Sequence, residues 1–213
     1  MMRQAKKEFG LLSDERGFTL IEMAIVLIII GIIIGAVVKG KDIIRSGEQK
    51  KLYSTFISAW ETTYSSYYDR TGWILGDDDA DPQVNRNGQC GDGGSLATGA
   101  ILDAQLTRVG LESPVPGPTG ASNVRTYTDS AGNFATITLE FGYNAAYGNY
   151  IQMAAIPNEL GMAIDRIIDG QMDGTAGNFL YIPNSGTMGT TAAWPLAATA
   201  PAAASLTILR LPF

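Results

Sequence analysis

The sequence predicts an α+β protein in which a long N-terminal α-helix packs on a small head built around an antiparallel β-sheet. Three observations lead to this prediction. A long, mostly apolar run with a single charged residue covers residues 18–38. Beyond it, apolar and aromatic residues recur every four positions from Leu52 to Tyr68, as they do on one face of a helix. Short segments rich in Thr, Val, Ile and aromatic residues, separated by turn residues, then fill much of the second half.

Composition excludes several classes of protein. With 46% hydrophobic and 17% charged residues, the chain has the composition of a folded protein. Its formal net charge of −6 argues against a nucleic-acid partner, because phosphate contacts need clustered Lys and Arg. The absence of histidine excludes Ser-His-Asp and Cys-His catalysis and imidazole metal sites. A hydrolase using carboxylates such as Asp77 and Asp169 has no pattern that brings them together, so we do not expect an enzyme.

Residues 1–17 form a short charged leader, and residues 18–38 form the first predicted helix. The charged residues of the leader are Arg3, Lys6, Glu8, Lys7, Asp14, Glu15 and Arg16. A helix over 18–38 would be roughly 30 Å long, which is enough to cross the apolar core of a bilayer. An ordinary secretory signal is excluded because the apolar run is too long and lacks a small-x-small cleavage site at its far end.

Glu22 is the only charged residue in this apolar stretch. A carboxylate in a membrane helix costs a few kcal/mol when it is charged and unpaired, so such residues are usually functional rather than part of a plain anchor. Residues 17–22, with the sequence GFTLIE, resemble the prepilin cleavage signature of type IV pilins and type II secretion pseudopilins. The resemblance covers about the first 50 residues.

The resemblance implies two processing steps and one assembly contact. A prepilin peptidase would cut between Gly17 and Phe18 on the cytoplasmic side, and the new amine of Phe18 would be N-methylated. Glu22 would then pair with the Phe18 amine of a neighbouring subunit. A buried charge is tolerable when it is paired in this way, and the pair would fix the register of the assembly.

Gly31 and Gly35 form a Gly-x-x-x-Gly pair within the apolar stretch. Such a pair favours close helix packing in a membrane. It also weakens the helix, because glycine costs about 1 kcal/mol in a helix interior. The resemblance implies the second role, helix flexibility, through partial melting after extraction from the bilayer. Lys39 stands where many members of the family have proline, which leaves this melting open.

Residues 39–71 are predicted to continue the helix as an amphipathic segment that packs against the head. The stripe that would face the head consists of Leu52, Phe56, Trp60, Tyr64 and Tyr68. The basic residues of this segment are Lys39, Lys41, Arg45, Lys50 and Lys51. They lie on the side opposite to the one that the positive-inside rule predicts, so the orientation rests on the cleavage motif.

Gly72 is predicted to end the helix and residues 72–213 to form the head. Strands are expected at residues 124–128, 134–141, 150–155, 179–182 and 206–211, the first two as a hairpin. One helix is expected over residues 96–109, capped by Ser95 and closed by Gly110, and another after Pro157. Residues 111–122 and 185–205 are expected to be loops. The lone Cys90 indicates either a buried thiol or an intermolecular bridge.

Two acidic segments are candidate calcium sites, and no other cofactor is expected. The first holds Asp77, Asp79 and Asp81; the second holds Asp169 and Asp173. Both supply the oxygen ligands that calcium prefers, but neither matches an EF-hand loop. Solvated Asx turns explain the same residues. Both segments also resemble recurring loops of pilin-like heads.

The sequence therefore indicates a structural subunit of a type IV pilus or a related pseudopilus. The alternative is a minor, tip-located or adhesive subunit with a binding role in secretion, attachment or DNA uptake. The expected partners are copies of the chain, other pilin-like subunits, the prepilin peptidase and an assembly platform. The chain would first cross the inner membrane once, with the leader cytoplasmic and the head periplasmic or extracellular. It would then reside in a pilus or a periplasmic pseudopilus.

Overall fold

The computed structural model of the chain describes residues 17–77, 86–91, 96–114, 120–183, 188–195 and 205–213. The predictions for the leader at 1–16, for Asp79 and Asp81, and for the Ser95 cap therefore lie outside the described residues. Internal contacts divide the chain into two compact units, Met1–Ile44 and Arg45–Phe213.

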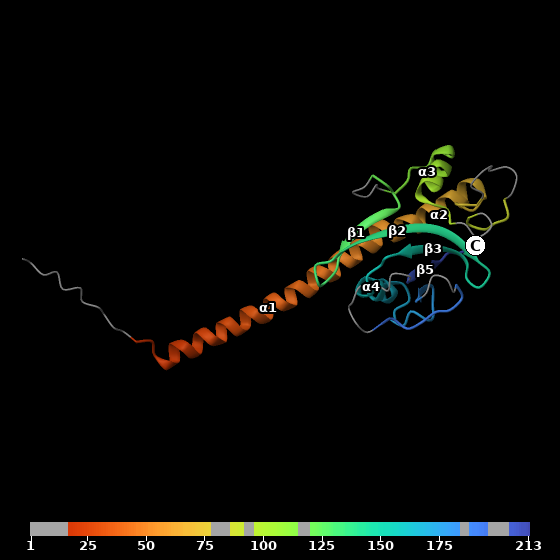
Figure 1. Ribbon diagram of the computed structural model, residues 1–213. Helices are drawn as coiled ribbons and strands as arrows, with labels where there is room; N and C mark the ends of the chain where they lie inside the picture. The colour runs from red at the N-terminus through yellow and green to blue at the C-terminus, as the bar shows by residue number, and fades with distance from the viewer. Residues whose placement is uncertain (1–16, 78–85, 92–95, 115–119, 184–187, 196–204) are drawn as a thin grey trace, which may run out of the picture. The chain divides into compact units, whose positions relative to one another are not determined.

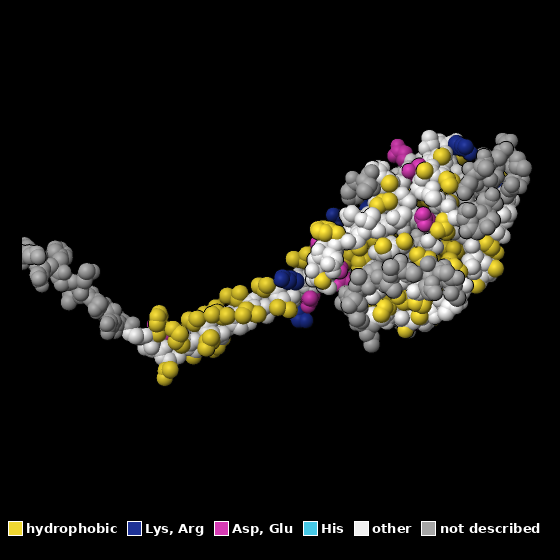
Figure 2. All heavy atoms as spheres, in the orientation of Figure 1, with side chains coloured by type: hydrophobic (Ala, Val, Ile, Leu, Met, Phe, Trp, Pro, Cys, Tyr) yellow, Lys and Arg dark blue, Asp and Glu magenta, His cyan; other side chains and the backbone are white. Residues whose placement is uncertain are grey.

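The first unit consists mainly of helix α1, which runs Leu20–Leu52 and continues into the second unit (Figure 1). No residue of α1 is buried in the isolated chain. Hydrophobic side chains cover the surface of its first part (Figure 2). By length and composition, this helix is able to cross a membrane. The long apolar helix predicted from the sequence is confirmed.

The helix continues through a π-helical segment, η1 (Tyr53–Ile57), into helix α2 (Ser58–Thr71). The hydroxyls of Ser54 and Thr55 donate to the backbone carbonyl of Lys51, at 3.1 and 2.8 Å. Such side-chain contacts compete with the helix's own hydrogen bonds and often bend it. Gly72, with a left-handed φ of 73°, ends α2 as predicted.

Five antiparallel strands form one sheet in the order β1-β2-β3-β5-β4. The strands are β1 (Val124–Thr128), β2 (Phe134–Asn144), β3 (Gly148–Ala154), β4 (Phe179–Ile182) and β5 (Leu206–Arg210). All five were predicted. The connection between β2 and β3 is tighter than expected, because the Asn144 side chain accepts from the N–H of Ala146 and Gly148 takes a φ of 77°. Both strands therefore extend into the residues expected to join them.

The main core lies between one face of the sheet and the α2 stripe. Phe56, Trp60 and Tyr64 are each 0% exposed. Phe141 of β2 meets the Trp60 ring edge-on at a centroid distance of 5.7 Å, and the Tyr64 ring stacks on it at 5.8 Å. Helix α4 (Asn158–Ile168), which begins after Pro157 as predicted, adds apolar residues to the same core. The predicted helical stripe is confirmed at its centre, whereas its end residues, Leu52 and Tyr68, are only partly buried.

The helix predicted over residues 96–109 is shorter than expected. Helix α3 spans Gly99–Arg108, with Thr98 before it. Ala97 instead forms a β-bridge with Phe141, in which each backbone N–H donates to the other residue's carbonyl, at 2.8 and 3.1 Å. This pairing with the sheet prevents residues 96–98 from joining the helix. The predicted closing residue, Gly110, follows α3 with a left-handed φ of 69°.

Candidate processing and assembly segment

The segment that carries Glu22 begins with a capped helix end. The Glu22 Oε2 atom accepts hydrogen bonds from the Thr19 N–H and hydroxyl, each at 2.8 Å, and the Glu22 N–H donates to the Thr19 hydroxyl at 3.3 Å. This reciprocal pattern is a capping box, which satisfies donors that the first helical turn leaves free. Thr19 was not singled out from the sequence, although the Thr-x-x-Glu spacing could have identified it.

The predicted scissile bond lies immediately before this capped turn. Gly17, Phe18 and Thr19 are outside regular secondary structure, and the Phe18 side chain is 78% exposed. Exposed irregular backbone is the form in which chains are most readily cleaved. Cleavage between Gly17 and Phe18, and N-methylation of Phe18, remain predictions.

Gly31 and Gly35 lie within an unbroken stretch of α1, and a Cβ atom at either would meet nothing within 4 Å. The Lys39 ammonium lies 4.0 Å from the Asp42 carboxylate, and both side chains are well exposed. Such a surface pair contributes at most about 1 kcal/mol. Melting at the two glycines therefore remains a prediction, as does the effect of Lys39.

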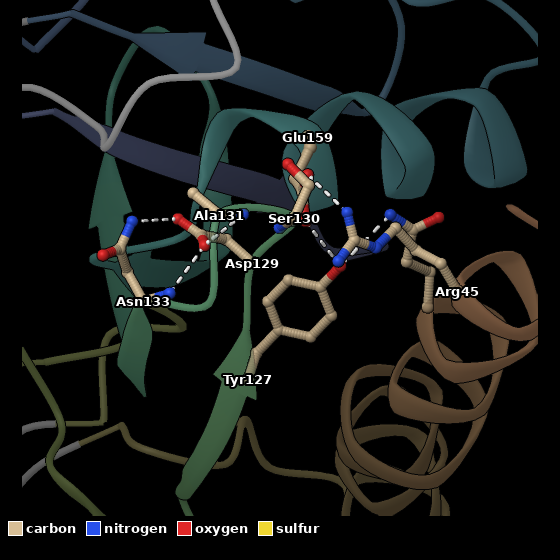
Figure 3. A network of polar contacts seen from close by, with 8 residues as sticks. Arg45, Tyr127, Asp129, Ser130, Ala131, Asn133 and Glu159 are labelled. Atoms are coloured by element: carbon tan, nitrogen blue, oxygen red, sulfur yellow. Dashed lines mark hydrogen bonds and ion pairs between the residues drawn. The ribbon is translucent and has the colours of Figure 1, made fainter. Parts of the chain in front are cut away.

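The second unit begins with a polar network that joins the end of α1 to the head (Figure 3). Glu159, in the first turn of α4, accepts from Arg45 Nη1 at 3.3 Å, the Tyr127 hydroxyl at 2.9 Å and the Ser130 N–H at 3.0 Å. The Gln49 side-chain amide donates to the Tyr127 hydroxyl at 3.3 Å. Burial, reinforced by the Glu159 carboxylate, raises the pKa of Tyr127 to about 12. We call the set Arg45, Gln49, Tyr127, Ser130 and Glu159 the polar latch.

The turn between β1 and β2 is held by Asp129. Its carboxylate accepts from the N–H of Ala131 at 2.9 Å and from the N–H and side-chain amide of Asn133 at 2.8 and 2.9 Å (Figure 3). The bonds from Asn133 hold the pKa of Asp129 below its ordinary value. The hairpin tip is therefore an ordered element that the polar latch ties to Arg45 through Ser130.

The described residues of the candidate calcium sites bond to nearby backbone. Asp77 accepts from the N–H of Asn87 and Gly88. Asp169 accepts from the N–H groups of Asn178 and Phe179. Asp173 accepts from the N–H groups of Thr175 and Ala176. Within the described ranges, no group of three or more acidic, His or Cys residues is arranged to hold a metal. Calcium binding stays a prediction.

Cys90 lies in the core of the head, 1% exposed, with its thiol 3.3 Å from the Leu75 carbonyl. Burial raises the pKa of this thiol well above its ordinary value. A buried, protonated thiol is a poor nucleophile. Of the two alternatives drawn from the sequence, a buried thiol or an intermolecular bridge, this placement agrees with the buried thiol.

Asp165 is a buried carboxylate that the sequence did not bring to attention. Its Oδ2 atom accepts from the Trp194 indole at 2.7 Å and from the Gly174 N–H at 3.0 Å, while Oδ1 has no hydrogen bond from the described residues. Burial raises the pKa of Asp165. Trp194 lies in a segment that was expected to be only a loop, so nothing local indicated this contact.

Comparison with known proteins identifies the N-terminal segment. Residues 12–38 match the family described as the prokaryotic N-terminal methylation motif, the signature of type IV pilin and pseudopilin precursors. No curated protein and no solved structure matches the chain. The matched family is structural rather than catalytic, and the match covers the leader and the first part of α1 but not the head.

Proposed function

We propose that this chain, which carries a prepilin-type methylation motif, is a structural subunit of a type IV pilus or a related pseudopilus. A prepilin peptidase removes residues 1–17, and the processed chain polymerises through its N-terminal helix. The observation that carries the proposal is Glu22, a single carboxylate that follows the cleavage signature in an otherwise uncharged apolar helix. In a helix that served only as an anchor this charge would be costly, and an uncharged glutamine could supply the same cap.

The geometry at Glu22 supports a role in assembly. The capping box uses one carboxylate oxygen, Oε2, and Oε1 accepts no hydrogen bond from the described residues. Glu22 can therefore receive the Phe18 amine of a neighbouring subunit without giving up its bonds to Thr19. Because an ion pair in an apolar surrounding is stabilising only when its geometry is well fixed, the cap also favours the pairing.

The same proposal gives the chain its partners and location. It spans the inner membrane once before assembly, with the leader cytoplasmic and the head periplasmic or extracellular. It then contacts copies of itself, other pilin-like subunits and an assembly platform, in a pilus or a periplasmic pseudopilus. The early glutamate favours a subunit of the filament body over a minor subunit that starts assembly.

The test uses two measurements, the mass of the processed chain and the yield of filaments. Intact mass spectrometry of the assembled protein should show loss of residues 1–17 and one added methyl group on Phe18. Glu22→Ala should still be cleaved but should block or slow assembly, because the Phe18 amine loses its counter-charge. Glu48→Ala, an exposed glutamate beyond the apolar stretch, is the matched control and should assemble normally. An intact leader in filaments, or a normal filament yield from Glu22→Ala, would contradict the proposal.

A further inference from the structure

We propose that the open edge of strand β1 and the helix beside it form a docking groove for an extended peptide segment of a partner protein. The segment pairs with β1 as an added strand, and it carries an apolar and an acidic side chain two residues apart. All residues that form the groove belong to the second unit. The proposal is independent of the processing and anchoring proposed above.

The hydrogen-bonding phase of β1, which forms one edge of the sheet, shows which of its backbone groups face outward (Figure 1). Just before the strand, the Leu139 N–H of β2 donates to the Asn123 carbonyl at 2.9 Å. Opposed residues of an antiparallel ladder alternate between bonded and non-bonded pairs. Val124, opposite Thr138, is therefore the first residue of β1 whose N–H and C=O point away from β2. The outward-facing residues of the strand are Val124, Thr126 and Thr128.

Most of these outward groups are open. The Val124 carbonyl accepts from Arg125 Nη1 at 2.8 Å. No described residue forms a backbone hydrogen bond with the outward groups of Thr126 and Thr128. The opposite edge of the sheet differs, because the N–H and C=O of Tyr181 in β4 bond to the backbone of neighbouring loops at 2.8 and 3.0 Å. The chain thus covers one edge and leaves the other as a template for a further strand.

A groove of about 440 Å³ runs along the open edge, within the usual range for ligand pockets. Arg125 and Tyr127 of β1 direct their side chains to the helix, so those of Thr126 and Thr128 point to the other face of the sheet. Both threonines therefore border the groove mainly with their backbone. This is the geometry of strand addition, in which backbone hydrogen bonds provide affinity and side-chain contacts provide specificity. The helix wall consists of Glu48, Lys51, Leu52, Thr55 and Phe56.

The helix wall determines which side chains an added strand should carry. Leu52 and Phe56, one turn apart, provide its apolar part. Alternate side chains of a strand share a face and are about 7 Å apart. An apolar side chain over these two residues therefore places the next one on the same face within reach of the long Lys51 side chain. Lys51 is exposed and has no ion pair with a described residue.

Charge complementarity makes this second side chain acidic. The groove is lined by two basic residues, Lys51 and Arg125, and by one acidic residue, Glu48. An acidic side chain gives Lys51 the partner that it lacks, whereas a basic one would be repelled. The preferred segment is therefore extended, with an apolar residue and an acidic residue separated by one position.

The competing occupant is the β1 edge of a second copy of the chain. Two β1 strands paired in antiparallel fashion would be related by a two-fold axis, with both helices on the same face of the joined sheet. The strands would be about 4.8 Å apart, whereas a helix with its side chains is about 10 Å wide. Because each helix already lies beside its own edge, the two helices would overlap. The groove therefore favours a single extended segment.

The test measures binding of fluorescein-labelled heptapeptides to the full-length protein in detergent, by fluorescence anisotropy. The peptides have blocked ends and consist of threonine with one isoleucine and one aspartate two positions apart, in either order. Each is also made with N-methyl groups on one or the other set of alternate residues, since only one set can donate to β1. Thr126→Pro removes an outward N–H, which edge strands tolerate, and Thr126→Ala is the matched control that keeps it.

The two methylation patterns should differ at least fivefold in affinity for the wild type. Thr126→Pro should weaken binding at least fivefold, and Thr126→Ala should stay within about twofold. Lys51→Glu should also weaken it, and a peptide with lysine in place of aspartate should recover that loss.

Equal effects of the two methylation patterns would overturn strand addition, and this result needs no change in the protein. Affinity unchanged by both Thr126→Pro and Lys51→Glu would place the peptide elsewhere and overturn the groove. Absence of binding by either peptide at 1 mM would overturn the occupant. Dimerisation of the wild type in light scattering, lost in Thr126→Pro, would overturn it in favour of pairing between two copies.

Discussion

Replacing Glu159 by alanine should destabilise the head, because this one carboxylate accepts hydrogen bonds from three donors that are distant from one another in the sequence of the second unit. Arg45 comes from the end of α1, Tyr127 from β1 and Ser130 from the hairpin turn. The Glu159 side chain is 13% exposed and that of Arg45 is 34% exposed. The contacts are therefore partly shielded from water, and most of their strength should be measurable.

The expected loss of unfolding free energy depends on whether each donor finds another hydrogen-bond acceptor once the Glu159 carboxylate is removed. A hydrogen bond to a charged group contributes about 1.5–3 kcal/mol. The Tyr127 hydroxyl is the least able to recover, since it is the donor most deeply buried. Ser130 can turn to water, and Arg45 is exposed enough that its ion pair contributes at most about 1 kcal/mol. The expected total is about 2–3 kcal/mol, which corresponds to a fall in Tm of roughly 4–12 °C for a domain of this size.

The assay is urea unfolding of the full-length protein in detergent, followed by the fluorescence of the buried Trp60 and Trp194. Glu159→Gln keeps the shape and should lose about 1 kcal/mol, because a neutral acceptor forms weaker bonds. The exposed Glu48→Ala variant should stay within about 0.5 kcal/mol of the wild type. If Glu159→Ala matched Glu48→Ala, the polar latch would contribute nothing to stability and the reasoning would be refuted.

Two further predictions concern the contacts of Trp194. Because burial raises the pKa of Asp165, the folded head holds that proton more tightly than the unfolded chain does; the resulting stability is present at acidic pH and is lost as the pH rises through the raised pKa. Asp165→Asn should therefore show a flatter profile of Tm against acidic pH than the wild type, and identical profiles would count against it. A Cβ atom at Gly161 would lie 2.3 Å from the Trp194 ring, so Gly161→Ala should cost about 1–2 kcal/mol in urea unfolding, after its gain in helix propensity. The same change should be nearly neutral in a Trp194→Leu background, and an equal cost there would remove the ring as its cause.

Most elements of the fold could be predicted because their signals are local. The β4 segment, for instance, is bounded by turn residues and contains mostly β-favouring side chains. The start of α3 could not be predicted, since Ala97 is drawn out of the helix by Phe141, a partner 44 residues away. The π-helical segment was also missed, because the hydroxyls that accompany it are compatible with an ordinary α-helix.

The segment around Glu22 and the polar latch also differ in whether their signals are local in the sequence. Glu22 and its surroundings lie within a few residues of one another, so a short motif identifies them, and even the Thr19 cap was present in the spacing. The polar latch joins Arg45 to Glu159 across 114 residues. Sequence patterns alone do not pair charges so far apart, since many acidic residues in the chain were equally available to Arg45.

The contacts of the helix change in kind along the second unit, and this change bears on how the head would fit into the proposed filament. From Arg45 to Leu52 no residue is buried, and the hydrogen bonds to the head come from side chains such as Arg45 and Gln49. From Phe56 onward the contacts are buried and aromatic. Truncating a large aromatic core residue costs about 3–5 kcal/mol, whereas a single hydrogen bond contributes about 1 kcal/mol. Local separation of the helix from the rest of the head should therefore begin at Arg45. It should stop at the π-helical segment, where the buried aromatic packing starts. The first turns of the second unit can then adjust to a new neighbour while the core of the head stays intact.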